Sequence, residues 1–246
     1  MKKYLSFAVF ALLVAFTSLG LSSCGSDDDD VVNPITGNSM DNDHEYVDLG
    51  LPSGLKWATC NVGADSPEAY GTYFAWGETK AKSMYNWSTY SWGTDWDELT
   101  KYCTYSSYGK KAFTDTKTIL ELADDAARAN WGGYWRMPTA ADFDELLANT
   151  NNEWVSNYNS TGVAGCRFTA ANGNQIFLPA AGYRVGPSLD GTGSYGYYWS
   201  SSLNTDSPGC AYYLYFNSLG HVYVDGSGSY RYGGRYGGRT VRPVLP

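Results

Sequence analysis

Few side chains in this sequence have the type and spacing that catalysis requires. The carboxylate pairs Asp95/Asp97 and Asp142/Asp144 stand at i, i+2, so on a helix they point apart, whereas paired glycosidase carboxylates need a defined separation. The chain has no Gly-x-Ser-x-Gly elbow, no glycine-rich phosphate loop and no histidine with a recognisable partner. The sequence therefore predicts a protein that is not an enzyme and uses no cofactor.

Residues 229–239, near the C-terminus, alternate tyrosine, arginine and glycine. Tyrosine rings offer stacking planes and arginine offers fork-shaped donors, which suit sugar hydroxyls, carboxylates or sulfates. The candidate ligand-binding residues are Tyr230, Arg231, Tyr232, Arg235 and Tyr236. The alternative is a glycine-rich hairpin whose arginines neutralise the domain's own acids.

The cysteines indicate disulfides and not a metal site. Cys60, Cys103, Cys166 and Cys210 are an even number in a chain with an export signal, so two disulfides are expected, in one of three connectivities. We predict Cys60–Cys103 and Cys166–Cys210, the second because both cysteines lie in strand-like runs that could be neighbours. The sequence has two histidines and no Cys-x-x-Cys pair, so no zinc or copper site is expected.

The N-terminus has the pattern of an export signal. Lys2 and Lys3 precede an apolar run, residues 7–21, that is too short for a convincing membrane span. The run ends in Leu-Ser-Ser-Cys24, which resembles the lipobox of bacterial lipoproteins. This resemblance implies a signal peptide of residues 1–23, cleavage before Cys24, and lipid attachment to Cys24, including an acyl chain such as palmitate.

Residues 24–44 are polar, contain the acidic run Asp27–Asp30 and lack apolar periodicity, which predicts a solvated tether. The acidic run resembles the signal that sends Bacteroidetes lipoproteins to the cell surface. It implies an outer-membrane location with the domain facing outward. The alternative is that charge repulsion only keeps the tether extended.

Composition favours one extracellular, β-rich and loop-rich domain over residues 45–246. Aromatic residues make up 16% of the chain, with 22 Tyr and 28 Gly. The formal net charge is −8, which argues against a nucleic-acid partner. The length suits a single domain with a full core.

Two helices are expected. Residues 118–129 carry apolar side chains at helical spacing, with Asp124 and Asp125 on the polar face. Gly132-Gly133 ends this helix. In the second helix, Thr139 and Asp142 resemble a capping box, and an apolar stripe follows at i, i+3, i+4: Phe143, Leu146 and Leu147.

The remaining elements are strands and loops. A hairpin opens the domain between residues 45 and 63, and residues 73–76 form a buried strand-like run. Residues 77–112 are irregular, with a short helix starting at 95–98; such long irregular segments are usually functional or held by a ligand, metal or disulfide. Further strands are predicted at residues 153–158, 165–169, 175–179, 197–201, 210–217, 221–224 and 240–244. This pattern predicts an α+β domain with two helices packed on antiparallel sheets.

Five motifs in this order resemble the Fibrobacter succinogenes major paralogous domain family, which is common in Bacteroidetes lipoproteins. They are residues 47–63, 131–139, 177–183, 198–202 and 241–244. The family is similar to the C-type-lectin-like fold and, distantly, to formylglycine-generating enzyme. The resemblance implies a C-type-lectin-like domain whose first and last strands pair. Structural roles are expected for Trp131, Arg136, Pro138, Thr139 and Trp199.

The functional sites of those relatives do not carry over. Formylglycine-generating enzyme holds copper with a cysteine pair near its C-terminus, and here no cysteine follows Cys210. The calcium-site triplets of C-type lectins are also missing, since Trp199 is followed by three serines. The expected function is a non-catalytic binding or adhesion domain for glycan or protein. The alternative is a structural or assembly subunit of a surface appendage.

Overall fold

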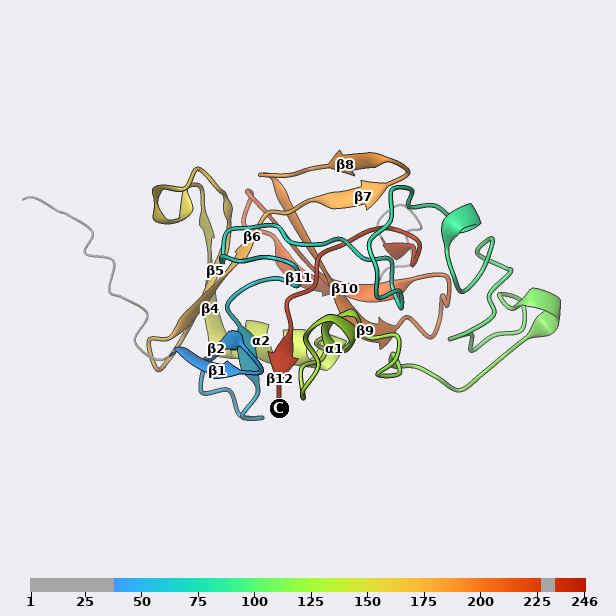
Figure 1. The fold of residues 1–246 in the computed structure, drawn as a ribbon, viewed down its shortest axis with the longest axis horizontal. Coiled ribbons are helices and arrows are strands. Elements are labelled where there is room, and N and C mark those ends of the chain that lie inside the picture. Colours follow the sequence, from blue (N-terminus) through green and yellow to red (C-terminus); the bar gives the residue numbers. More distant parts are fainter. Residues whose placement is uncertain (1–37, 227–232) are drawn as a thin grey trace, which may run out of the picture. The chain divides into compact units, whose positions relative to one another are not determined.

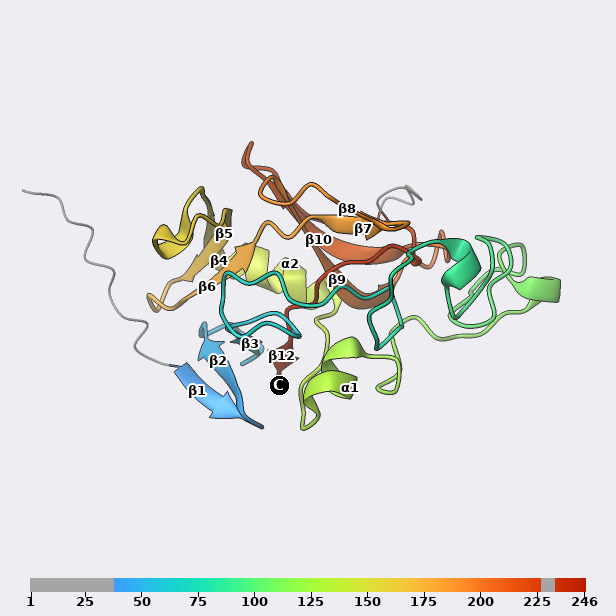
Figure 2. The same ribbon diagram turned by 45° about the horizontal axis from the view of Figure 1, so that its top comes forward.

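The structure is a computed structural model, and it describes residues 38–226 and 233–246. Within these residues the strands form antiparallel sheets, and two α-helices lie among them (Figures 1 and 2). Contacts group these described residues into one compact unit. The fold is therefore α+β, as the sequence predicts.

One sheet joins the two ends of the described chain. Its order is β1 (Asn38–Asp41), β2 (His44–Asp48), β3 (Lys56–Ala58) and β12 (Val244–Leu245). Val244 stands opposite Trp57, and both side chains are buried in the same core cluster. The last strand thus joins the sheet of the opening hairpin. Its partner is β3, however, and not the first strand as expected.

Strand β1 lies inside the range 24–44 that was predicted to be tether, so that prediction is wrong for residues 38–44. The turn from β1 to β2 consists of Asn42 and Asp43, which both have positive φ, at 47° and 65°. Asn and Asp tolerate this conformation, and two such residues match the twist of antiparallel strands. The sequence did not predict strand β1 because Ser39 and Met40 are exposed, so the strand lacks an apolar alternation.

A second sheet, ordered β11-β10-β9, carries the longest strands of the described chain. The bounds are β9 Tyr195–Leu203, β10 Ala211–Asn217 and β11 Val222–Asp225. On one face, Tyr198, Leu214 and Phe216 are buried against the core that contains Phe143 and Leu146 of helix α2 (Ala140–Asn149). Helix α2 contacts all three strands (Figure 1). On the opposite face, Trp199 and Tyr213 are buried in a second core cluster, which also contains Trp76.

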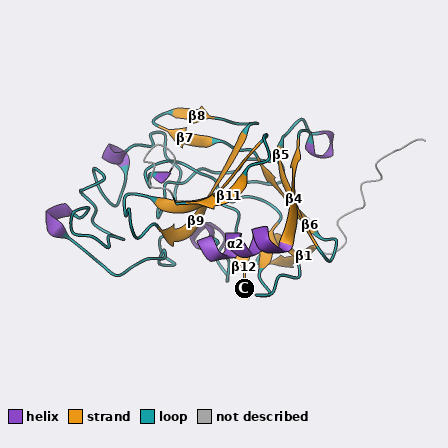
Figure 3. Ribbon diagram, turned by 180° about the vertical axis from the view of Figure 1, so that it is seen from behind, coloured by secondary structure: helices purple, strands orange, loops and turns teal. Residues whose placement is uncertain are grey.

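Two smaller sheets complete the set. The sheet β4-β5-β6 comprises Thr150–Val155, Gly165–Ala170 and Gln175–Pro179, and the hairpin β7-β8 comprises Tyr183–Val185 and Ser188–Asp190. Short 3-10 turns lie at η1 (Trp87–Thr89), η2 (Lys110–Ala112) and η3 (Tyr158–Ser160). The segment between β3 and the first helix is otherwise loop, drawn in teal in Figure 3.

The stretch that leads into α2 behaves as predicted. Thr139 accepts a hydrogen bond from the Asp142 backbone N–H, and the Asp142 side chain accepts one from the Thr139 N–H, which completes a capping box. Arg136 Nη1 lies 2.6 Å from Asp142 Oδ2, so Arg136 supports the cap instead of facing a ligand. Trp131, Pro138 and Trp199 are buried. These structural roles fit the sequence.

The first helix is shorter than predicted. Helix α1 spans Ala126–Trp131, whereas residues 118–122 are not helical, and Ile119 and Leu122 are 45% and 58% exposed. Asp125 is the cause, because its Oδ1 accepts from the Arg128 N–H and so caps a helix that begins after it. Asp124 and Asp125 are also buried, so their assignment to a polar helix face is wrong.

The short helix expected to open at residues 95–98 is absent from the described chain. Leu99 is instead fully buried and forms isolated bridges to Gly93 and Gly109. The buried run 73–76 and the glycine that ends α1, Gly132 with φ 70°, agree with the predictions.

Candidate functional site

The face of the β9-β10-β11 sheet opposite α2 carries tyrosines in cross-strand rows, of which Tyr197 and Tyr213 are buried and Tyr195 and Tyr223 are exposed. Tyr215 of β10 stands opposite Tyr197 of β9 on one side and Tyr223 of β11 on the other. In the neighbouring row, Tyr213 stands between Trp199 and Asp225. Because side chains alternate between faces along a strand, these two rows share one face.

The tyrosine face forms the wall of a pocket, which we call the tyrosine pocket. Its volume is about 290 Å³, and its lining residues are Tyr183, Tyr195, Tyr197, Tyr213, Tyr215, Tyr223 and Asp225. The ring of Tyr183, from β7, meets that of Tyr197 edge to face at 5.0 Å between centroids. A pocket of this size and composition suits a small ligand that carries both flat apolar surface and hydroxyl groups.

Asp225 is the one carboxylate in this lining. It accepts a hydrogen bond of 2.6 Å from the Tyr213 hydroxyl. Burial raises the pKa of Tyr213 well above its ordinary value; the nearby Arg239 opposes this shift and the bond to Asp225 adds to it. Tyr213 is therefore a fixed donor at neutral pH, and it holds the carboxylate in place.

Arg239 lies beside the same row of side chains. Its guanidinium carbon is 3.9 Å from the ring centroid of Trp199 and 4.1 Å from that of Tyr213. Arg239 is buried, and within the described chain its Nε and Nη1 have no hydrogen-bond partner. Burial lowers the pKa of Arg239 to about 10, so it stays a cation at neutral pH. Its charge formally balances that of Asp225.

Neither a family model nor a curated protein nor a solved structure matches this chain. The site is therefore interpreted from its own geometry. Among the described residues no helix has the length and apolar character needed to cross a membrane.

Of the five predicted ligand residues, the structure describes two, Arg235 and Tyr236. Tyr230, Arg231 and Tyr232 lie outside the described residues. Arg235 is fully buried, and its guanidinium donates to the Tyr90 hydroxyl and to the carbonyls of Lys101, Tyr102 and Pro208 at 2.9–3.0 Å. It also stacks over Trp76, at 4.8 Å from the ring centroid. The prediction that Arg235 binds a ligand is wrong, because every contact in this set is internal.

Tyr236 is half-buried, and its ring lies 5.1 Å from that of Trp87 in η1. Tyr236 and Arg235 together attach the C-terminal turn to the irregular segment 77–112. Aromatic and arginine contacts therefore hold that segment to the C-terminal turn.

The predicted disulfides are not formed, and Cys60, Cys103, Cys166 and Cys210 are free thiols. Cys166 lies on β5 between β4 and β6, whereas Cys210 forms a bridge with Gly234, so the two do not occupy neighbouring strands. Burial raises the pKa of Cys166 to about 12 and that of Cys210 to about 11. Both are therefore protonated, weak nucleophiles at neutral pH.

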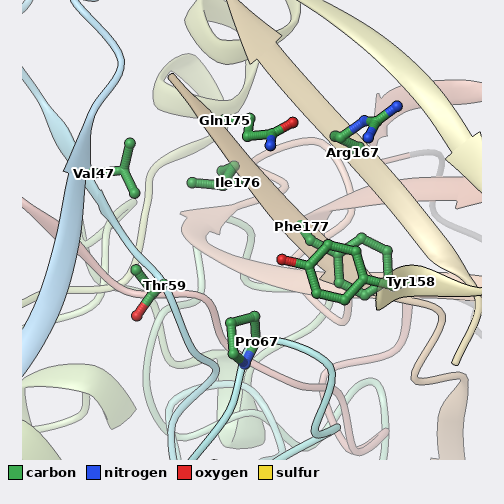
Figure 4. Close-up of a pocket in the computed structure, with 8 residues that line it drawn as sticks. All are labelled: Val47, Thr59, Pro67, Tyr158, Arg167, Gln175, Ile176 and Phe177. Carbon is green, nitrogen blue, oxygen red and sulfur yellow. The ribbon is translucent and has the colours of Figure 1, made fainter. Parts of the chain in front are cut away.

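Two other features of the described chain offer less. No group of three or more His, Cys, Asp or Glu side chains there is placed to hold a metal ion. The hollow in Figure 4 lies between the opening hairpin and β6, where the Tyr158 and Phe177 rings stack at 3.9 Å. Its volume is about 10 Å³, which is room for about one water molecule.

Sequence reasoning missed the residues of the tyrosine pocket. A signal was present, because tyrosines recur at every second position in Tyr195-Gly-Tyr197 and Tyr213-Leu-Tyr215, and Asp225 follows Tyr223 at the same spacing. Period-2 aromatics on predicted strands indicate one aromatic sheet face. That face could not be assigned to core or to surface without knowing which side α2 covers.

Proposed function

We propose that this protein is a non-catalytic glycan-binding domain, held on the outer face of the outer membrane by lipid on Cys24. The observation that carries the binding function is the tyrosine pocket, with six phenol rings and one carboxylate around about 290 Å³. Phenol rings stack on the apolar face of a sugar ring, while Asp225 and the tyrosine hydroxyls exchange hydrogen bonds with its hydroxyl groups.

The charges of the pocket favour a neutral sugar. Asp225 and the buried Arg239 carry opposite charges beside the same row of rings, so a charged ligand gains little net Coulomb energy there. A pocket of this volume takes roughly one or two sugar rings.

A glycan array with residues 24–246 carrying Cys24→Ser tests this function. Tyr223 and Tyr195 line the pocket and are 46% and 40% exposed, so their removal spares the core. Tyr223→Ala and Tyr195→Ala should each weaken binding roughly tenfold, because each removes a stacking ring. Tyr134→Ala is the matched control, since Tyr134 is 76% exposed and does not line the pocket. An array without reproducible binding would favour an assembly subunit of a surface appendage instead.

The family and the location are part of the same proposal. Membership in the Fibrobacter succinogenes major paralogous domain family, with its C-type-lectin-like fold, rests on the five motifs and is supported by the capping box at Thr139. An experimental structure superposed on a C-type-lectin-like domain tests the fold. Antibody labelling of intact cells tests surface exposure, and labelling only after the outer membrane is broken would contradict it.

A further inference from the structure

A second hollow lies in the segment that sequence reasoning marked as irregular. It has a volume of about 320 Å³, and none of its lining residues lines the tyrosine pocket. We call it the loop pocket; its lining residues are Gly77, Glu78, Thr79, Lys80, Ala81, Lys82, Thr89, Ser91, Trp92, Ala123 and Asp124.

One wall of the loop pocket is fixed by Glu78. Its Oε1 accepts from the Ser91 N–H at 2.8 Å and from the Ser91 hydroxyl at 2.9 Å, and its Oε2 lies 2.8 Å from Lys82 Nζ. Lys82 Nζ also donates to the Thr89 carbonyl at 3.0 Å. These contacts hold a carboxylate and an ammonium group in a defined arrangement before any ligand arrives.

Asp124 and Trp92 form another part of the lining. Asp124 Oδ2 accepts from the Tyr102 hydroxyl and from Lys101 Nζ, both at 2.5 Å. Lys101 Nζ lies 4.8 Å from the Trp92 ring, and the Trp92 indole N–H donates to the Gly77 carbonyl at 2.8 Å. The aromatic side chain of Trp92 is thus held by the Gly77 carbonyl and lies beside the Asp124–Lys101 pair.

The charges of this lining select the class of ligand. Glu78 pairs with Lys82, and Asp124 pairs with Lys101, so an ionic group bound at either carboxylate would have to compete with an ion pair that already exists. A hydroxyl group can donate to a carboxylate and accept from an ammonium group, so it binds without breaking either pair. We infer that the loop pocket is a second ligand site of this chain and that it takes a neutral sugar ring against Trp92.

The Trp92 indole reports on this pocket alone, because no tryptophan lines the tyrosine pocket. The mature chain carrying Cys24→Ser, labelled with ¹⁵N, is titrated with glucose, galactose, mannose and N-acetylglucosamine, and Trp92→Phe assigns the indole signal. At least one sugar should shift that signal in a saturable way. If none of the four shifts it at up to about 50 mM, where a millimolar site is filled, the inference is wrong.

Two exposed alanines allow the pocket to be filled without loss of a buried contact. Ala123→Phe, with Ala81→Phe as the second variant should the first not fold, is expected to abolish the indole shift. Ala148→Phe on the exposed side of α2 is the matched control and should leave the shift unchanged. Tyr223→Ala should also leave it unchanged, which separates this site from the tyrosine pocket. A shift that persists in the filled variant, or that disappears with Tyr223→Ala, overturns the inference.

Discussion

Buried arginine is the residue type whose role the structure changes most. Arg235 is fully buried and makes four hydrogen bonds, three of them to carbonyls of residues 101, 102 and 208. A planar guanidinium can satisfy several carbonyls at once, which a lysine ammonium on its flexible stem cannot do in the same geometry. At this position arginine therefore fastens the C-terminal turn to the irregular segment.

Arg235→Ala should lower the free energy of unfolding by about 3 kcal/mol or more, because it removes bonds from a charged donor and leaves buried carbonyls unpaired. Urea denaturation measures this change. The control is Arg167→Ala, which breaks an exposed ion pair with Glu153 and should cost less than about 1 kcal/mol. Equal losses in the two variants would show that Arg235 does not fasten the fold.

His44 links the stability of the first hairpin to pH. Its ring stacks on Trp131 at 3.8 Å, and burial lowers the pKa of its imidazole, although Asp43 and Asp41 oppose the shift. The unfolded chain then binds the proton more readily than the folded chain. The contribution of His44 is full above pH 6.5, the unfolded pKa, and is lost as pH falls through the lower folded pKa.

We therefore expect the melting temperature to decrease when the pH is lowered from 7.5 to 5.5. The variant His44→Gln should show a smaller decrease. Calorimetry at the two pH values for both proteins measures the difference. If the melting temperature of His44→Gln depends on pH as strongly as that of the wild type, other groups cause the pH dependence.

At the scale of elements, α1 shows how one capping residue sets the start of a helix against the apolar pattern of the sequence. Asp125 Oδ1 caps the Arg128 N–H at 2.9 Å, and its Oδ2 accepts from the Met137 N–H at 2.8 Å. One buried carboxylate thus fixes both the start of α1 and the chain that leads into α2. Side-chain bonds of this kind compete with helix formation, so the helical spacing at residues 118–122 is not used.

Asp125→Asn and Asp125→Ala test in two steps how much the Asp125 carboxylate stabilises the fold. The amide keeps an acceptor for the Arg128 N–H but turns its NH₂ group toward the Met137 N–H, so we expect a loss of about 1–2 kcal/mol. Alanine removes both acceptors and should cost about 2–4 kcal/mol. Chemical denaturation gives both values, with Asp144→Ala on the exposed side of α2 as the neutral control. If Asp125→Ala is as stable as the wild type, the Asp125 carboxylate does not fix the start of α1 and the chain that leads into α2.

At the scale of the whole molecule, two pockets of similar volume are built in different ways. The tyrosine pocket depends on strand register, whereas the loop pocket depends on ion pairs that fix an irregular segment. Two sites on one domain raise the avidity for a multivalent glycan when both can be reached at once.

Several features followed from the sequence alone because their signals are local. The capping box at Thr139 lies within four residues, and strand β6 follows from its own run of side chains. The α+β class follows from the order of such elements. Each of these is decided by a short stretch of backbone, so no distant partner has to be known.

Only the tertiary structure decided which side chains come together in a pocket. Tyr183, Tyr197, Tyr215 and Tyr223 come from four different strands, and they meet because of pairing register and because α2 covers the other face of the sheet. Arg235 and Tyr90 lie far apart in the chain, and packing turns a candidate ligand residue into an internal clamp. Burial depends on neighbours distant in sequence, and periodicity within one strand cannot report which neighbours those are.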